Sequence, residues 1–219
     1  MNSLPDNVQI IDMPSLFRGM HIMLPSNAFN RFTHVRELIC TDLEWTSLPT
    51  LPPTLKKLYC FNNRLASLPE LPSTLTHLYC HHNALTLLPT LPNTLRELYC
   101  SNNLLSTLPE LPNTLSELSC SDNRLSLLPE LPSTLTVVYC SNNQLPSLPA
   151  LPAALEKLDC SENPLTLLPE LPNALENLHC SKNRLTSLPI SLTSTSIVDL
   201  NCDQNQLTSL PLLPSTLIE

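Results

Sequence analysis

The chain has 219 residues, a formal net charge of −8, 23 prolines and one glycine. The acidic balance argues against nucleic-acid binding through a basic stripe, so no nucleic-acid partner is expected. No apolar run approaches the ~20 residues of a membrane-spanning helix, so no membrane span is expected either. The prolines recur beside leucine at fixed positions, which indicates a folded repeat instead of a disordered tail.

Residues 1–34 carry an irregular version of the pattern that fills the rest of the chain. Val8, Ile11 and Met13 have the spacing that inward-facing residues take in the later segments. We therefore interpret residues 1–34 as a degenerate N-terminal coil or cap. A helical turn is predicted near residues 15–20.

Residues 35–219 repeat the twenty-residue phrase L-x-x-L-x-C-x-x-N-x-L-x-x-L-P-x-L-P-x-x. A fixed period of this length is the signature of stacked repeats, each of which buries its apolar side chains against its neighbours. We predict nine repeats that end at the start of a further strand. Eight have the common period, and one has 22 residues and should differ from the others over residues 190–196.

Each unit contains one predicted strand, such as residues 95–100. Because strand side chains alternate, Leu98 and Cys100 should face inward, whereas Glu97 and Tyr99 face outward. Neighbouring strands would pair in parallel, ~4.8 Å apart. The L-P-x-L-P segment should return on the other side as extended, polyproline-like backbone. The predicted fold class is a repeat solenoid with a parallel sheet on its concave face and little helix.

Two residue types recur where we expect structural ladders inside the stack. Buried cysteine behaves as a small apolar side chain, and thiols in a straight file suit neither disulfides nor a zinc site. The short asparagine amide can satisfy backbone groups of its own coil and the adjacent one. The predicted ladders are Cys60, Cys80, Cys100, Cys120, Cys140, Cys160 and Cys180, and Asn63, Asn83, Asn103, Asn123, Asn143, Asn163 and Asn183.

No catalytic constellation is readable in the sequence. His77 and His81 would share the outward face, but four residues of strand separate them by about 13 Å, too far for one metal ion. Serine recurs after the cysteine in five units, as a packing residue would, with no activating base beside it. We expect no enzyme activity, no metal and no cofactor.

The repeated phrase resembles the leucine-rich repeat family, in the short form found in bacterial effectors such as YopM and the IpaH proteins. The resemblance covers about residues 35–217. It implies a non-enzymatic, protein-binding scaffold that acts on host proteins inside a host cell. Three features depart from that pattern. Cysteine replaces an aliphatic residue, the IpaH catalytic domain has no counterpart, and no N-terminal helical hairpin like that of YopM is evident.

The outward strand face is the candidate binding surface, because all four tyrosines of the chain fall in one of its columns. Tyrosine is enriched in protein interfaces, and we expect this column to be an exposed aromatic file that binds a protein or peptide. The alternative is that the stacked rings only support neighbouring strands. The predicted binding residues are Lys57, Tyr59, Phe61, His77, Tyr79, His81, Glu97, Tyr99, Glu117, Tyr139, Asp159 and His179.

Three other functions stay open: the substrate-recognition part of a ubiquitin ligase whose catalytic domain is absent here, a carbohydrate-binding repeat protein, and a structural repeat without a strong ligand. Asp6 and Asp12 interrupt the apolar stretch that a secretory signal needs, so the nine cysteines are expected to be thiols in a reducing compartment such as the cytoplasm. Export into a host cell without a cleaved signal peptide is compatible with this. Residues 217–219 begin another strand with no polar cap, so we expect either self-association through this C-terminal edge or further sequence beyond it.

Overall fold

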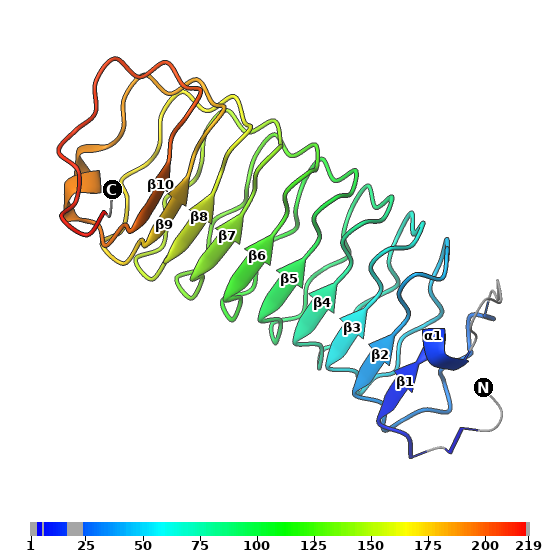
Figure 1. The fold of residues 1–219 in the computed structure, drawn as a ribbon. Helices are drawn as coiled ribbons and strands as arrows, with labels where there is room; N and C mark the ends of the chain where they lie inside the picture. The colour runs from blue at the N-terminus through cyan, green and yellow to red at the C-terminus, as the bar shows by residue number, and fades with distance from the viewer. Residues whose placement is uncertain (1–3, 6, 17–23, 218–219) are drawn as a thin grey trace.

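The computed structural model describes residues 4–5, 7–16 and 24–217. Within these ranges ten parallel strands of three residues each form one sheet, in chain order (Figure 1). The strands are β1 (Ile10–Asp12), β2 (Glu37–Ile39), β3 (Lys57–Tyr59), β4 (His77–Tyr79), β5 (Glu97–Tyr99), β6 (Glu117–Ser119), β7 (Val137–Tyr139), β8 (Lys157–Asp159), β9 (Asn177–His179) and β10 (Asp199–Asn201). The predicted solenoid, with its parallel sheet and little helix, is confirmed.

The strand register follows the sequence period. Tyr59 lies opposite Tyr79 in the β3–β4 pair, so equivalent positions of successive units align in straight columns. The longer last unit keeps this register, with Leu178 opposite Leu200. Its two extra residues are accommodated on the other side of the coil, where a 3-10 helix, η1 (Ile190–Ser194), replaces the extended segment.

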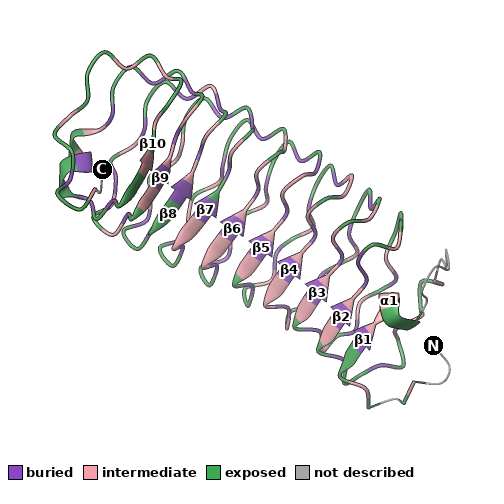
Figure 2. Ribbon diagram, viewed as in Figure 1, coloured by how far each residue is buried: buried purple, intermediate pink, exposed green. Residues whose placement is uncertain are grey.

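The core is a continuous file of leucines and cysteines behind the sheet. The middle residue of every strand from β1 to β9 is buried, and most of its neighbours in the strand are half-buried (Figure 2). Leu98 and Cys100 are fully buried, as the alternation predicts, whereas Glu97 and Tyr99 lie on the outer face. All nine cysteines are thiols, and eight of them are buried. Burial raises the pKa of the Cys120 thiol well above its ordinary value.

The asparagine column connects neighbouring coils through buried hydrogen bonds. The Nδ2 atom of Asn103 donates to the carbonyl oxygens of Cys80 at 3.1 Å and of Cys100 at 3.0 Å. Its Oδ1 atom accepts from the backbone N–H of Leu85 at 3.0 Å. One side chain therefore satisfies backbone groups in two coils that water cannot reach. The same pattern recurs from Asn63 to Asn205.

The residue before each ladder asparagine adopts a left-handed backbone conformation, with φ between 51° and 56°. This region favours glycine and, among other residues, asparagine. Hydrogen bonds from the next coil hold the conformation; the backbone N–H of Asn102, for example, donates to the carbonyl oxygen of Ser121 at 2.9 Å. These residues are Asn62, His82, Asn102, Asp122, Asn142, Glu162, Lys182 and Gln204.

The two ends of the array differ from its middle. At the N-terminus a short helix, α1 (Met13–Leu16), begins just after β1, earlier than the predicted turn, and Asp12 Oδ1 accepts from the backbone N–H of Ser15 at 3.1 Å. Residues 17–20 of that predicted turn lie outside the described residues. So do residues 218–219 of the predicted further strand.

Candidate functional site

Five aromatic side chains form two stacked columns on the outer face of strands β3–β5. Tyr59 and Tyr79 stack with ring centroids 4.8 Å apart and planes 1° from parallel, and Tyr99 continues the stack 5.0 Å from Tyr79. Two residues further along their coils, Phe61 and His81 stack at 4.5 Å. In-register parallel strands produce this arrangement, because their spacing of ~4.8 Å is close to that of stacked rings. We call Tyr59, Tyr79, Tyr99, Phe61 and His81 the aromatic patch.

The tyrosine column is less exposed than the sequence predicted. Tyr59, Tyr79 and Tyr99 are half-buried, because each ring covers part of the next one. Phe61, another predicted binding residue, is half-buried against His81. Only Tyr139, which the smaller Ser119 separates from the stack, reaches 36% exposure. The rings therefore support neighbouring coils as well as forming a surface.

Two tyrosine hydroxyls are held by glutamates of the following coil. The Tyr79 hydroxyl donates to a carboxylate oxygen of Glu97, and the Tyr99 hydroxyl donates to Glu117. Burial, followed by the hydrogen bond to the Glu97 carboxylate, raises the pKa of Tyr79 well above its ordinary value. His77 Nε2 lies 3.3 Å from the other oxygen of Glu97. The predicted site residues His77, Tyr79 and Glu97 therefore form one network.

Two tyrosine hydroxyls on the outer face are free to bind a ligand. Within the described residues, the hydroxyls of Tyr59 in the patch and of Tyr139 beyond it make no hydrogen bond. The Nδ1 atom of His81 also has no hydrogen-bond partner, but it is buried and out of reach of a surface ligand. Burial, followed by repulsion from neighbouring His82, lowers the pKa of His81. The imidazole is thus favoured in its neutral, stackable form. Lys57 lies beside the patch on β3.

The later part of the same face carries a small polar hollow of about 170 Å³ between strands β7 and β9. It brings together three predicted residues, Tyr139, Asp159 and His179, with Lys157 among its other lining residues. His179 Nε2 lies 3.0 Å from Asp199 Oδ2. This part of the face offers charged groups where the earlier part offers rings.

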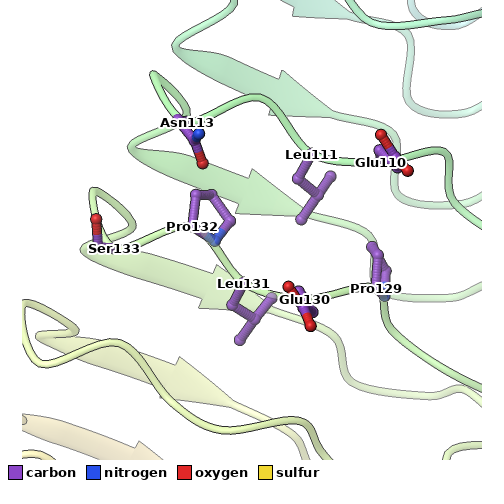
Figure 3. Close-up of a pocket in the computed structure, with 8 residues that line it drawn as sticks. All are labelled: Glu110, Leu111, Asn113, Pro129, Glu130, Leu131, Pro132 and Ser133. Carbon is purple, nitrogen blue, oxygen red and sulfur yellow. The ribbon is translucent and has the colours of Figure 1, made fainter.

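A larger hollow lies on the opposite side of the core. It measures about 610 Å³ and lies between two neighbouring proline-bearing segments (Figure 3). This hollow was not predicted from the sequence, although the repeat places a glutamate between the two Leu-Pro pairs of each segment that lines it. Its lining residues are Glu110, Leu111, Asn113, Pro129, Glu130, Leu131, Pro132 and Ser133.

The described residues contain no group of three or more histidine, cysteine or acidic side chains placed to hold a metal ion. Two of the recurrent serines bond to each other: Ser141 Oγ donates to Ser121 Oγ at 3.0 Å. None of the helices in the described ranges has the length and apolar character needed to cross a membrane.

Three solved structures are similar to this chain over most of its length. YopM from Yersinia enterocolitica WA-314 is 34% identical over 96% of this chain and 54% of YopM, with a TM-score of 0.66. YopM from Yersinia pestis, a leucine-rich effector protein, is 33% identical over 84% of this chain and 59% of YopM, with a TM-score of 0.70. A Shigella effector leucine-rich repeat domain is 31% identical over 78% of this chain and 70% of that domain, with a TM-score of 0.60.

No protein-family model matches the sequence, and no curated protein matches it. The chain spans between half and three-fifths of the two YopM chains. It covers more than two thirds of the Shigella domain and shares its short repeat. The chain therefore belongs to the leucine-rich repeat family.

Proposed function

We propose that this protein is a non-enzymatic scaffold that captures a protein or peptide partner on the aromatic patch. One observation carries the proposal: all four tyrosines of the chain lie on the outer strand face, three of them stacked over β3–β5. The other described aromatic residues apart from Phe61, namely Phe29, Phe32 and Trp45, are buried in the core. Rings that the core does not need, and that remain partly exposed, are typical of interface anchors.

The surroundings of the patch indicate how a partner would be oriented. Apolar contact would come from the faces and edges of the rings, and the free hydroxyl of Tyr59 would supply a polar contact at one end. Asp159, His179 and Asp199 lie further along the same face and favour a basic patch on the partner. Charged groups of this kind influence association rate and orientation more than affinity.

The similarity to bacterial effectors supports a setting in which the partner is a host protein. We infer that the protein acts as an exported effector on host proteins in a reducing compartment. Recognition of a substrate for a ubiquitin ligase would use the same surface, with catalysis supplied by another protein or domain. Carbohydrate binding is the main alternative, because sugar rings also stack on tyrosine.

Self-association through the C-terminal edge is a further proposal. Ile190 and Leu212 are about four-fifths exposed in the last coils, at 81% and 79%. Among the described residues, β10 pairs only with β9. An exposed strand edge beside apolar side chains can associate with another chain.

Replacing Tyr59, Tyr79 and Tyr99 together with serine should abolish partner capture while leaving the array folded. Ser119 occupies the same column naturally, so the sheet accepts serine there. Loss of ring stacking should lower the stability of the array modestly. The measurement is affinity capture from host-cell lysate, quantified by mass spectrometry, with circular dichroism to verify folding.

The matched control replaces Leu87, Leu127 and Leu167 with serine. These leucines are 55–62% exposed, and serine occupies their column in neighbouring units. The control should retain every partner that the tyrosine variant loses. Equal capture by both variants would contradict the proposal, and binding of the wild type to a glycan array alone would favour the carbohydrate alternative.

A further inference from the structure

A second surface column runs along the flank of the sheet, formed by the residue that precedes each strand. The backbone N–H of each member donates to the carbonyl oxygen of the same position in the previous coil, at 2.8–2.9 Å, so the column is straight and in register. We call this the flank column. Its members from β2 to β9 are Arg36, Lys56, Thr76, Arg96, Ser116, Thr136, Glu156 and Glu176.

The charges of the flank column are separated along the solenoid. Arg36 and Lys56 are neighbours at one end, and Glu156 and Glu176 are neighbours at the other. All four side chains are exposed, and none forms an ion pair within the described part of the chain. Like charges on adjacent strands repel each other, so each pair destabilises the isolated chain slightly.

The charges of the flank column match those of a second copy of the column that runs in the opposite direction. If a second copy runs antiparallel, with a two-fold axis between Arg96 and Ser116, then Arg36 meets Glu176 and Lys56 meets Glu156. Arg36 lies three coils before Arg96, and Glu176 lies three coils after Ser116, so the distances match at ~4.8 Å per coil. The polar middle pairs are Arg96 with Ser116 and Thr76 with Thr136.

We propose that the flank column is the interface of an antiparallel homodimer. Two-fold symmetry uses the same patch on both subunits, so each ion pair forms twice. A hollow of about 210 Å³ beside the basic end, lined by His34, Arg36 and Lys56 among others, provides space for the acidic end of the second copy. Guanidinium and carboxylate groups form the strongest hydrogen-bonded ion pairs available to side chains.

The neighbouring column shows why the contact is confined to the flank. With the same two-fold axis, the first residues of the strands would place Lys57 against Lys157 and Glu97 against Glu117. These pairs repel, so the outer strand faces of the two copies must point away from each other. The aromatic patch therefore stays accessible in the dimer, and dimerisation does not depend on the proposed function.

The dimer should be weak and sensitive to salt. Exposed ion pairs contribute only about 0–1 kcal/mol each, and salt screens them. Four such pairs contribute at most about 4 kcal/mol, which corresponds to a dissociation constant of about 1 mM. Sedimentation velocity of the wild type at about 1 mM protein should therefore show dimer at about 20 mM salt and monomer at about 500 mM, where the screening length falls well below 10 Å. A wild-type monomer at both salt concentrations would overturn the proposal.

Charge reversal provides the decisive comparison. An acidic variant, Arg36→Glu with Lys56→Glu, and a basic variant, Glu156→Lys with Glu176→Lys, should each be monomeric at low salt. An equimolar mixture of the two should form a heterodimer, because both ends then meet opposite charges. A mixture that stays monomeric, or single variants that still dimerise, would overturn the flank interface.

A control separates this interface from the C-terminal edge. Ile190→Ser with Leu212→Ser removes exposed apolar side chains from the last coils and should leave the salt-sensitive dimer intact. The triple serine variant of the aromatic patch should dimerise as well. Loss of the dimer in either control would assign the contact to another surface and contradict the proposal.

Discussion

The variant Cys120→Asp is expected to be unfolded at 25 °C. Cys120 is fully buried in the middle of the cysteine file, between Cys100 and Cys140. A carboxylate there would lose its hydration without gaining a cation, and even a protonated carboxyl group would lack hydrogen-bond partners, at a cost of several kcal/mol. Urea unfolding followed by far-ultraviolet circular dichroism measures the loss.

The matched control is Cys120→Val, which keeps a small apolar side chain in a strand that favours branched residues. It should change the free energy of unfolding by no more than about 1 kcal/mol. Wild-type stability of Cys120→Asp would show that the cysteine column does not face the interior.

The variant Asn103→Ala should lower the free energy of unfolding by about 3 kcal/mol or more. Its side chain is 6% exposed and serves backbone groups of Cys80, Cys100 and Leu85. Alanine would leave these buried groups without partners in two adjacent coils. Because each coil is stabilised by its neighbours, the loss in mid-array should lower the urea midpoint of the whole transition.

Asn93→Ala is the control for this prediction. Asn93 is exposed on the proline-bearing side, and its side chain forms no hydrogen bond within the described part of the chain. Its replacement should change stability by less than about 0.5 kcal/mol. Equal effects at both positions would mean that the asparagine column is not a structural ladder.

The sequence predicted the parts of the structure that depend on period alone. Strand alternation predicted that Leu98 and Cys100 face inward and Tyr99 outward, and all three do. The extra residues of the last unit indicated a local departure, which the structure shows as η1. These predictions succeeded because equivalent positions in a stacked repeat have the same surroundings.

The features that the sequence did not predict depend on contacts between neighbouring coils. The hydroxyl contact of Tyr79 with Glu97 requires a particular rotamer at both residues. The tyrosines are partly buried because their rings overlap, and the repeat period of the sequence does not predict that overlap. The left-handed backbone at Glu162 and Lys182 was also missed, because residue preferences favour glycine or asparagine there.

The flank column is partly predictable from the sequence and partly not. Its charges are readable in the sequence at a fixed period, from Arg36 to Glu176. Two antiparallel copies can pair these charges only if the column is straight and exposed. The register of the strands shows that it is. Sequence and structure were both required for this inference.

The orientation of the strands, with thiols inside and tyrosines outside, is the claim on which the binding surface depends. Thiol labelling of the native protein, counted by intact-mass spectrometry, tests it most directly. Desolvation raises the pKa of all nine thiols, but Cys202 is only half-buried, whereas the other eight cysteines are buried. We predict a single adduct, at Cys202, until denaturant is added. Rapid labelling of several thiols between Cys60 and Cys180 in the folded protein would contradict the account.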